Sequence, residues 1–186
     1  MLIFLDFEAS SLGKQSYPVE VAWAAEDGSQ ESHLIRPAPD WTDWDPASEA
    51  IHGIPRDVLT RDGTPHDQVA ARMIEALSGH DLRASAPSWD GKWLSALLRA
   101  AGLPRHSLRL RDSDDAHREL ATTILAPAIP ASELSEQVER VLAETELQGA
   151  ASVPAHRALP DALAELARWR TVGAAARALA ATYGGQ

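Results

Sequence analysis

The sequence contains no cysteine, and only two of its 186 residues are lysine. The absence of cysteine excludes a disulfide framework and a zinc site built from thiolates. Long apolar runs are also missing at the N-terminus, where residues 2–5 form a run of four that ends at Asp6. Such a run is too short for a signal-peptide core or a membrane span. We therefore expect a cytoplasmic protein that has no membrane partner.

Positive charge is scarce as well. The chain has 17 lysines and arginines against 27 acidic residues, which gives a formal net charge of −10. A protein that holds long duplex nucleic acid by neutralising phosphates should be basic, so extended electrostatic binding of this kind is not expected. Most of the acidic surplus is interpreted as a solubilising surface. It is also compatible with a divalent-cation site, whose ligands are hard oxygens.

The apolar pattern predicts strands first and then strands alternating with helices. Strands are expected at residues 2–6, 18–25, 31–36, 81–86 and 108–111. Helices are expected at residues 46–51, 55–60, 65–77, 90–101, 114–125, 132–147 and 160–182. The first three strands follow hairpin order, with Asp27-Gly28 as a turn. We therefore expect a mixed α/β sheet of about five strands flanked by helices, in a single domain of residues 1–186.

Asp6 and Glu8 are the first candidates for chemistry. Residues two apart on a strand share a face, with Cα atoms about 6.6 Å apart. Two carboxylates this close repel each other unless a cation lies between them. They also follow a buried strand, where α/β sheets place their ligands. Alone, the pair could equally mark a strand end that becomes exposed to solvent.

Three further residues complete the set. Asp90 follows a predicted strand and opens a helix, a position that also suits an aspartate in a helical first turn. His156 and Asp161 are five residues apart and would diverge on one continuous helix. Pro160 is best tolerated in the first turn of a helix. It therefore places Asp161 in that turn and His156 in the segment leading into it.

Together these residues predict a site for two divalent ions. Four carboxylates suit Mg²⁺ or Mn²⁺, which prefer oxygen ligands. Two such ions, about 4 Å apart, can activate a water and stabilise the leaving oxygen of a phosphodiester. A neutral histidine with a pKa of about 6.5 could accept the proton from that water.

In this order the motifs resemble those of the DEDD-type 3′–5′ exonucleases, in the subgroup with a histidine in its third motif (DEDDh), within the ribonuclease-H-like superfold. Residues 6–12, Asp-Phe-Glu-Ala-Ser-Ser-Leu, resemble the first motif Asp-x-Glu-Ala-Thr-Gly-Leu. Residues 51–54, Ile-His-Gly-Ile, resemble the segment after the third strand. Asp90 stands where the second motif supplies its aspartate, and residues 156–161 are similar to the third motif, His-x4-Asp.

The resemblance implies a role for each matched residue. The two metal ions would be held by Asp6, Glu8, Asp90 and Asp161, with His156 as the general base. Ala9 would offer its backbone to the terminal nucleotide, Leu12 would wedge against the terminal base, and His52 would lie near the scissile end. The expected partner is a single-stranded 3′ end of DNA or RNA, and the expected product is a nucleoside 5′-monophosphate. Monomer and homodimer stay open.

Two positions depart from the family's motifs. Ser11 stands in place of a glycine, so a positive φ there would be costly. Ala86 stands where many members have an asparagine that contacts the substrate backbone. Both changes concern the substrate cradle rather than the metal ligands.

Several other residues allow two interpretations of their role. Lys14 and Lys92 either contact a substrate phosphate or are solvated. Trp41 and Trp44 either stack on bases or cap the core under a loop. Glu20 is either a fifth acidic residue near the metals or a paired surface residue. The remaining histidines share no ligand spacing and are interpreted as surface or capping residues: His33, His66, His80, His106 and His117.

The function that fits best is a metal-dependent 3′–5′ exonuclease acting on single-stranded ends. One alternative is a non-catalytic binding or scaffold module with the same fold, although such a role would not require all five residues. A second is a metal-dependent nucleotide phosphohydrolase, which would cleave free mononucleotides as readily as oligomers.

Overall fold

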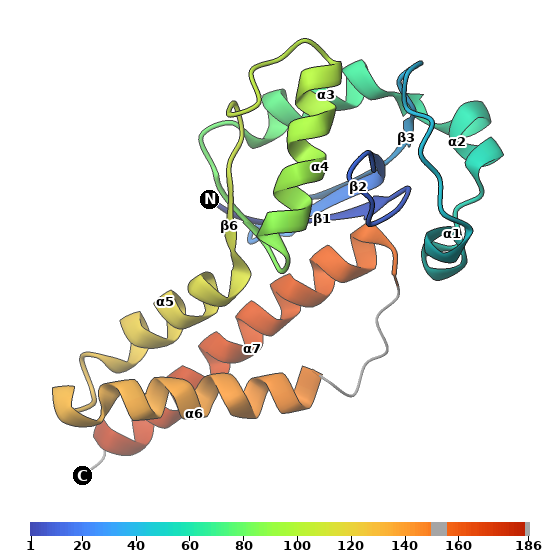
Figure 1. Ribbon diagram of the computed structural model, residues 1–186. Coiled ribbons are helices and arrows are strands. Elements are labelled where there is room, and N and C mark those ends of the chain that lie inside the picture. The colour runs from blue at the N-terminus through green and yellow to red at the C-terminus, as the bar shows by residue number, and fades with distance from the viewer. Residues whose placement is uncertain (150–155, 185–186) are drawn as a thin grey trace.

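The computed structural model describes residues 1–149 and 156–184, which form six strands and seven helices (Figure 1). The strands are β1 (Leu2–Ala9), β2 (Pro18–Ala25), β3 (Gln30–Arg36), β4 (Thr64–Pro65), β5 (Asp81–Ala84) and β6 (Leu110–Asp112). The helices are α1 (Pro46–His52), α2 (Arg56–Asp62), α3 (His66–Leu77), α4 (Pro87–Ala100), α5 (Ser113–Leu125), α6 (Ala131–Gly149) and α7 (Ala158–Gly184). The predicted single domain also includes residues 150–155 and 185–186, which lie outside the described residues.

One mixed sheet organises the fold, with the strand order β4-β3-β2-β1-β5-β6. β1, β2 and β3 pair antiparallel, whereas β5 pairs parallel with β1, and β6 pairs parallel with β5. The turn at Asp27-Gly28 connects β2 to β3, and Gly28 has the positive φ of 93° that such a turn requires. The predicted mixed α/β class is confirmed.

The sixth strand, β4, was not predicted. Thr64-Pro65 were expected to start a helix, but they pair with Ile35 and Arg36 of β3, and α3 begins only at His66. Gly63 makes this approach possible. A Cβ at this position would lie 2.7 Å from the backbone nitrogen of Arg36, so only glycine allows the two segments to come so close.

The side chains of β1 alternate between two cores. Ile3, Leu5 and Phe7 lie in the core formed with α3 and α4. Phe4 lies in the core on the opposite face, together with residues of α5 and α7. Asp6 has the same parity as Phe4 along the strand, so its side chain is directed to the face that α7 covers.

The three C-terminal helices α5, α6 and α7 pack on one another and extend beyond the sheet (Figure 1). The opposite, N-terminal end of α7 lies against β1 and β2. This arrangement brings the start of α7 to the edge of the sheet where β1 ends. None of the helices in the described parts of the chain is both long and apolar enough to cross a membrane.

Candidate active site

Three of the predicted ligands come together at the end of β1. Asp6 and Glu8 share the face of β1 that is covered by α7, and Asp161 lies in the first turn of α7, as Pro160 predicted. Each of the three residues offers a carboxylate oxygen, and these oxygens all lie within 4.8 Å of one another. The three side chains are half-buried, so the cluster remains accessible to solvent.

Asp90 approaches this cluster from the other face of the sheet. α4 begins at Pro87, three residues earlier than predicted, because proline is well suited to the first helical position. Asp90 therefore lies within the first turn, and only 2% of its surface is exposed. Its Oδ2 atom is buried and has no hydrogen-bond partner among the described residues. A buried carboxylate oxygen without a partner is costly, and a bound cation would satisfy it.

The electrostatics of the cluster favour a cation as well. Burial, with the negative charges of Asp90, Glu8 and Asp161, raises the pKa of Asp6 from its ordinary value of 3.8 to about 9. Burial and the charges of Asp161 and Glu20 raise the pKa of Glu8 to about 7. Burial raises the pKa of Asp90 to about 7 as well. Without a metal, these groups therefore resist ionisation.

The donor set fits Mg²⁺ or Mn²⁺. It consists of carboxylate oxygens only, which are the ligands that these ions prefer. The three clustered oxygens and the unpartnered Oδ2 of Asp90 are the groups that would hold the metal. A divalent ion there would favour the ionised carboxylates against the burial that raises all three pKa values and against the repulsion that adds to it for Asp6 and Glu8.

Sequence reasoning missed one interaction beside the cluster. Glu20 lies directly opposite Glu8 in the β1–β2 ladder. Its carboxylate accepts hydrogen bonds from Nε and Nη2 of Arg157 at 2.9 and 2.7 Å, and a third from the backbone N–H of Ala158 at 3.0 Å. Glu20 is paired, as one reading expected, but it is buried rather than on the surface. It ties the start of α7 to β2, and thereby positions Asp161 next to Glu8.

His156 lies directly before this tether. It is exposed and has a φ of 47°, the one positive φ among the described residues other than glycine. A non-glycine residue in this region is uncommon and indicates that its surroundings impose the conformation. The predicted placement of His156 outside α7 is therefore correct. No hydrogen bond joins it to the carboxylates among the described contacts.

The three expected substrate contacts lie in different surroundings. Ala9 is buried at the end of β1, next to an irregularity in the pairing between Glu8 and Ala9. Leu12 is 67% exposed, which is unusual for a leucine and leaves it free to contact a ligand. His52 is buried, its Nδ1 accepts a hydrogen bond from the N–H of Ile54 at 3.0 Å, and its Nε2 has no partner among the described residues. Burial lowers the pKa of His52, which therefore stays neutral near pH 7.

Ser11 fits its position without strain. Its backbone φ is not positive, and its hydroxyl donates a hydrogen bond to Asp43 and accepts one from the N–H of Gly13 at 2.9 Å. Ser10 donates to the same Asp43 carboxylate at 3.0 Å. These serine hydroxyls therefore bind the loop after β1 to the segment that precedes α1.

The structure distinguishes between the two roles considered for Lys92, Trp41 and Trp44. Lys92 is not simply solvated, because its Nζ donates to the hydroxyl of Ser16 at 2.8 Å and lies 5.0 Å from the ring centre of Trp89. Trp41 and Trp44 pack against the buried cluster around Tyr17, so both cap the core.

His117 was interpreted as a surface residue, but it is fully buried and stacks on Phe4, so that interpretation was wrong.

The sheet and helices share the fold of part of exonuclease I, as comparison with solved structures shows. A zinc-bound complex of E. coli exonuclease I with single-stranded DNA superposes with a TM-score of 0.65, at 18% sequence identity over 93% of this chain. Exonuclease I from Methylocaldum szegediense gives a TM-score of 0.64, at 21% identity over 90% of this chain. E. coli exonuclease I in complex with a dA16 oligonucleotide gives a TM-score of 0.63, at 16% identity over 93% of this chain.

The similarity covers only part of these exonucleases. The chain spans about two fifths of their length, with 40%, 39% and 40% of the three structures covered. No family model and no curated protein matches the sequence. The comparisons therefore establish the fold, and the activity is inferred from the residues of the site.

Proposed function

We propose that this protein is a metal-dependent 3′–5′ exonuclease of the DEDDh type, which acts through one domain. It would remove nucleoside 5′-monophosphates one at a time from single-stranded 3′ ends. The observation that supports this most strongly is the convergence of Asp6, Glu8 and Asp161, with the unpartnered Oδ2 of Asp90 nearby. The likeness to exonuclease I supports the same class of reaction. Its complexes with single-stranded DNA make DNA the first substrate to test.

The carboxylates have a binding role in this proposal. Asp6, Glu8, Asp90 and Asp161 would hold two ions of Mg²⁺ or Mn²⁺. Such ions would supply activation of the attacking water and stabilisation of the leaving 3′ oxygen. Glu20 with Arg157 keeps Asp161 in register with Glu8.

His156 is the proposed general base. It takes the proton from the attacking water at an imidazole nitrogen and releases it to solvent, which its exposed position permits. Because His156 lies before α7 rather than within it, the side chain can swing over the carboxylates without moving Asp161. Positioned proton transfer of this kind contributes about 10²–10⁴-fold to a rate.

The substrate end would contact the loop after β1 and the end of α1. Ala9 offers backbone groups to the terminal nucleotide, and the exposed Leu12 packs against its base. Because Nδ1 of the neutral His52 accepts a hydrogen bond from Ile54, its unpartnered Nε2 carries the proton and would donate a hydrogen bond near the scissile phosphate. An unblocked 3′ end is required, because a blocked end cannot be seated against Leu12 and Ala9.

A substrate comparison tests this function against its alternatives. Single-stranded DNA and RNA oligonucleotides, the same strands with a blocked 3′ end, and p-nitrophenyl phosphate are incubated with the protein and Mn²⁺. The exonuclease predicts loss of nucleotides from unblocked strands only. Faster hydrolysis of the small phosphate ester would favour a phosphohydrolase, and strand binding without cleavage would favour a binding module.

A further inference from the structure

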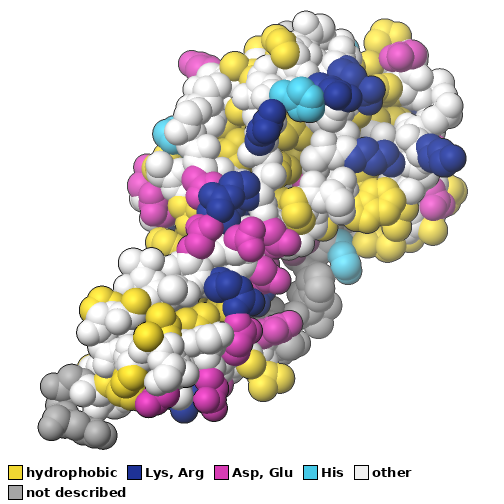
Figure 2. Space-filling view, turned by 60° about the vertical axis from the view of Figure 1, so that its left-hand side comes forward, with side chains coloured by type: hydrophobic (Ala, Val, Ile, Leu, Met, Phe, Trp, Pro, Cys, Tyr) yellow, Lys and Arg dark blue, Asp and Glu magenta, His cyan; other side chains and the backbone are white. Residues whose placement is uncertain are grey.

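Positive charge is concentrated in one segment of this acidic chain. Residues 91–111 contain five lysines and arginines and no acidic residue. The side of the molecule that carries β6 comes forward in Figure 2, where Lys and Arg side chains surround a histidine, whereas Asp and Glu lie mainly below them. A basic area on a protein of net charge −10 attracts anions locally.

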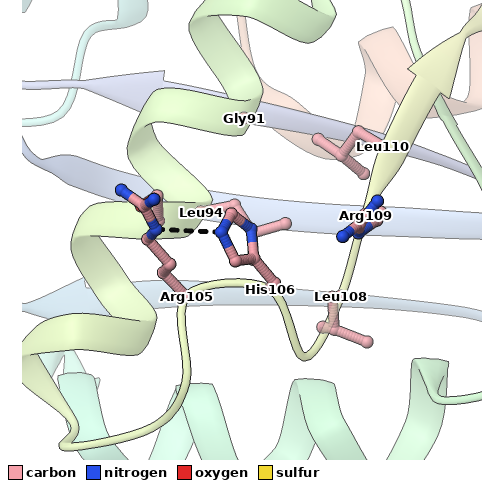
Figure 3. Close-up of a pocket in the computed structure, with 8 residues that line it drawn as sticks. Gly91, Leu94, Arg105, His106, Leu108, Arg109 and Leu110 are labelled. Carbon is pink, nitrogen blue, oxygen red and sulfur yellow. Dashed lines mark hydrogen bonds between the residues drawn. The ribbon is translucent and has the colours of Figure 1, made fainter.

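This segment forms a hollow between α4 and the loop that enters β6. Its volume is about 430 Å³, which is within the range of small-molecule sites. The lining contains no acidic residue and consists of Gly91, Leu94, Ser95, Arg105, His106, Leu108, Arg109 and Leu110. In Figure 3, Arg105 and Arg109 lie on the two sides of His106, with Leu94 of α4 behind them. The hollow thus combines cationic sides with an apolar floor.

The two arginines are available to a ligand. Neither Arg105 nor Arg109 forms an ion pair with an acidic side chain in the described parts of the chain, unlike Arg111, which pairs with Glu119 at 2.6 Å. Arg105 donates from Nε to Nε2 of His106 at 2.9 Å, which leaves its two terminal nitrogens free. A guanidinium held in this way can donate two parallel hydrogen bonds to a phosphate.

The hollow is close to the candidate active site along α4. Gly91, which lines the hollow, directly follows Asp90. Leu94 and Ser95 lie about one turn further along the helix, or roughly 6 Å at 1.5 Å per residue. The hollow therefore begins within about one helical turn of Asp90.

We propose that this hollow binds a nucleotide of the single-stranded substrate upstream of the 3′ end. Arg105 and Arg109 hold the phosphodiester, and the base packs against Leu94, Leu108 and Leu110. The inference rests on the proposed exonuclease function and extends it, because it gives the enzyme a second, sequence-independent contact. A dinucleotide, whose single phosphodiester would lie at the carboxylates, cannot make that contact. A free nucleoside monophosphate carries the same chemical groups, so the test separates the two ligands.

The test measures binding without catalysis. In EDTA, fluorescence anisotropy gives the affinity of the full chain for single-stranded DNA of 2 and of 12 nucleotides, and competition gives the affinity for AMP. The double variant R105A/R109A should weaken 12-mer binding about tenfold. It should also reduce the slope of log affinity against log salt concentration by about 0.7, the value expected for one lost phosphate contact on a single strand. Binding of the dinucleotide should change less than twofold.

The matched control is R61A/R140A, which removes two exposed arginines far from the hollow in sequence and should leave both affinities unchanged. Equal losses for the dinucleotide and the 12-mer, or no loss, would overturn the proposal. AMP binding that depends on Arg105 and Arg109 while 12-mer affinity does not would assign the hollow to a free nucleotide instead. If no variant cleaves DNA but the 12-mer still depends on these arginines, the exonuclease proposal fails and the binding site stands.

Discussion

Glu20 and Arg157 lie 137 residues apart in the sequence and form a bidentate ion pair, with the Glu20 carboxylate buried and the Arg157 side chain 45% exposed. The pair joins the second strand to the start of α7, next to the carboxylate cluster. The positive charge of Arg157 also lowers the pKa of Glu8, and it partly offsets the carboxylates of Asp161 and Glu20, which raise that pKa. We therefore regard it as a positioning element for the site.

Arg157→Ala should be more damaging than Glu20→Gln. Loss of Arg157 leaves the buried Glu20 charge without its cation, which typically costs about 3 kcal/mol, whereas loss of the Glu20 charge leaves an arginine that water can solvate. The free energy of unfolding, measured by urea denaturation, should follow this order. Asp114→Asn, which removes the exposed ion pair of Asp114 with Arg168 of α7, is the control and should cost less than about 1 kcal/mol. An equal cost for all three variants would contradict the role of the tether.

His156→Ala should lower the single-turnover rate about 10²–10⁴-fold while leaving Mn²⁺ affinity within twofold of wild type. The reason is that His156 is proposed to move a proton and not to hold the metal. Isothermal titration with Mn²⁺ checks the second half of the prediction. A loss of Mn²⁺ binding would instead make His156 a ligand.

Without a metal, the protein should become less stable as pH rises from 5 to 8. The folded state keeps the proton on Asp6 up to a pKa of about 9, whereas the unfolded chain releases it near 3.8. Over this window the folded state therefore binds more protons, and stability falls with pH. A loss of about 2 kcal/mol would lower the melting temperature by ~4–8 °C for a chain of this size. Mg²⁺ should stabilise more at pH 8 than at pH 5, as differential scanning calorimetry would show.

Asp6→Asn is the matched control for this pH dependence. It removes the titrating group while keeping the size of the side chain, so its metal-free melting temperature should vary much less between pH 5 and pH 8. A slope equal to that of wild type would show that other groups cause the effect.

Gly63→Ala and Gly91→Ala should have opposite effects on stability. A Cβ at residue 63 would lie 2.4 Å from the carbonyl oxygen of Leu59 and 2.7 Å from the backbone nitrogen of Arg36, so β4 would be pushed from β3 at a cost of about 2 kcal/mol. A Cβ at residue 91 meets nothing within 4 Å, and alanine in a helix gains about 0.5–1 kcal/mol over glycine. Thermal unfolding of both variants checks the difference in sign.

The strands and helices near the cluster were predictable because their signals are local. The apolar run at residues 2–5 predicted the strand β1, and the spacing of two residues placed Asp6 and Glu8 on one face of it. Pro160 separated His156 from Asp161. β4 was missed because its two residues pair only through the close approach that Gly63 allows. A segment that short carries no periodicity of its own.

Contacts between distant segments were not predictable from spacing. The alternation of β2 placed Glu20 on one face with Ala22, but nothing local identified Arg157 as its partner. His117 was missed for a similar reason. Its helix, α5, looks amphipathic, and only packing against Phe4 and α7 places the ring in the interior.

The most direct measurement is the cleavage of a 5′-labelled single-stranded 12-mer by the wild type and by Asp161→Asn, both in Mn²⁺. The account predicts a ladder that shortens by one nucleotide at a time from the 3′ end with the wild type, and an intact strand with Asp161→Asn. An intact strand with the wild type, or the same ladder with both proteins, would contradict the claim that the carboxylate cluster at the end of β1 is an exonuclease site.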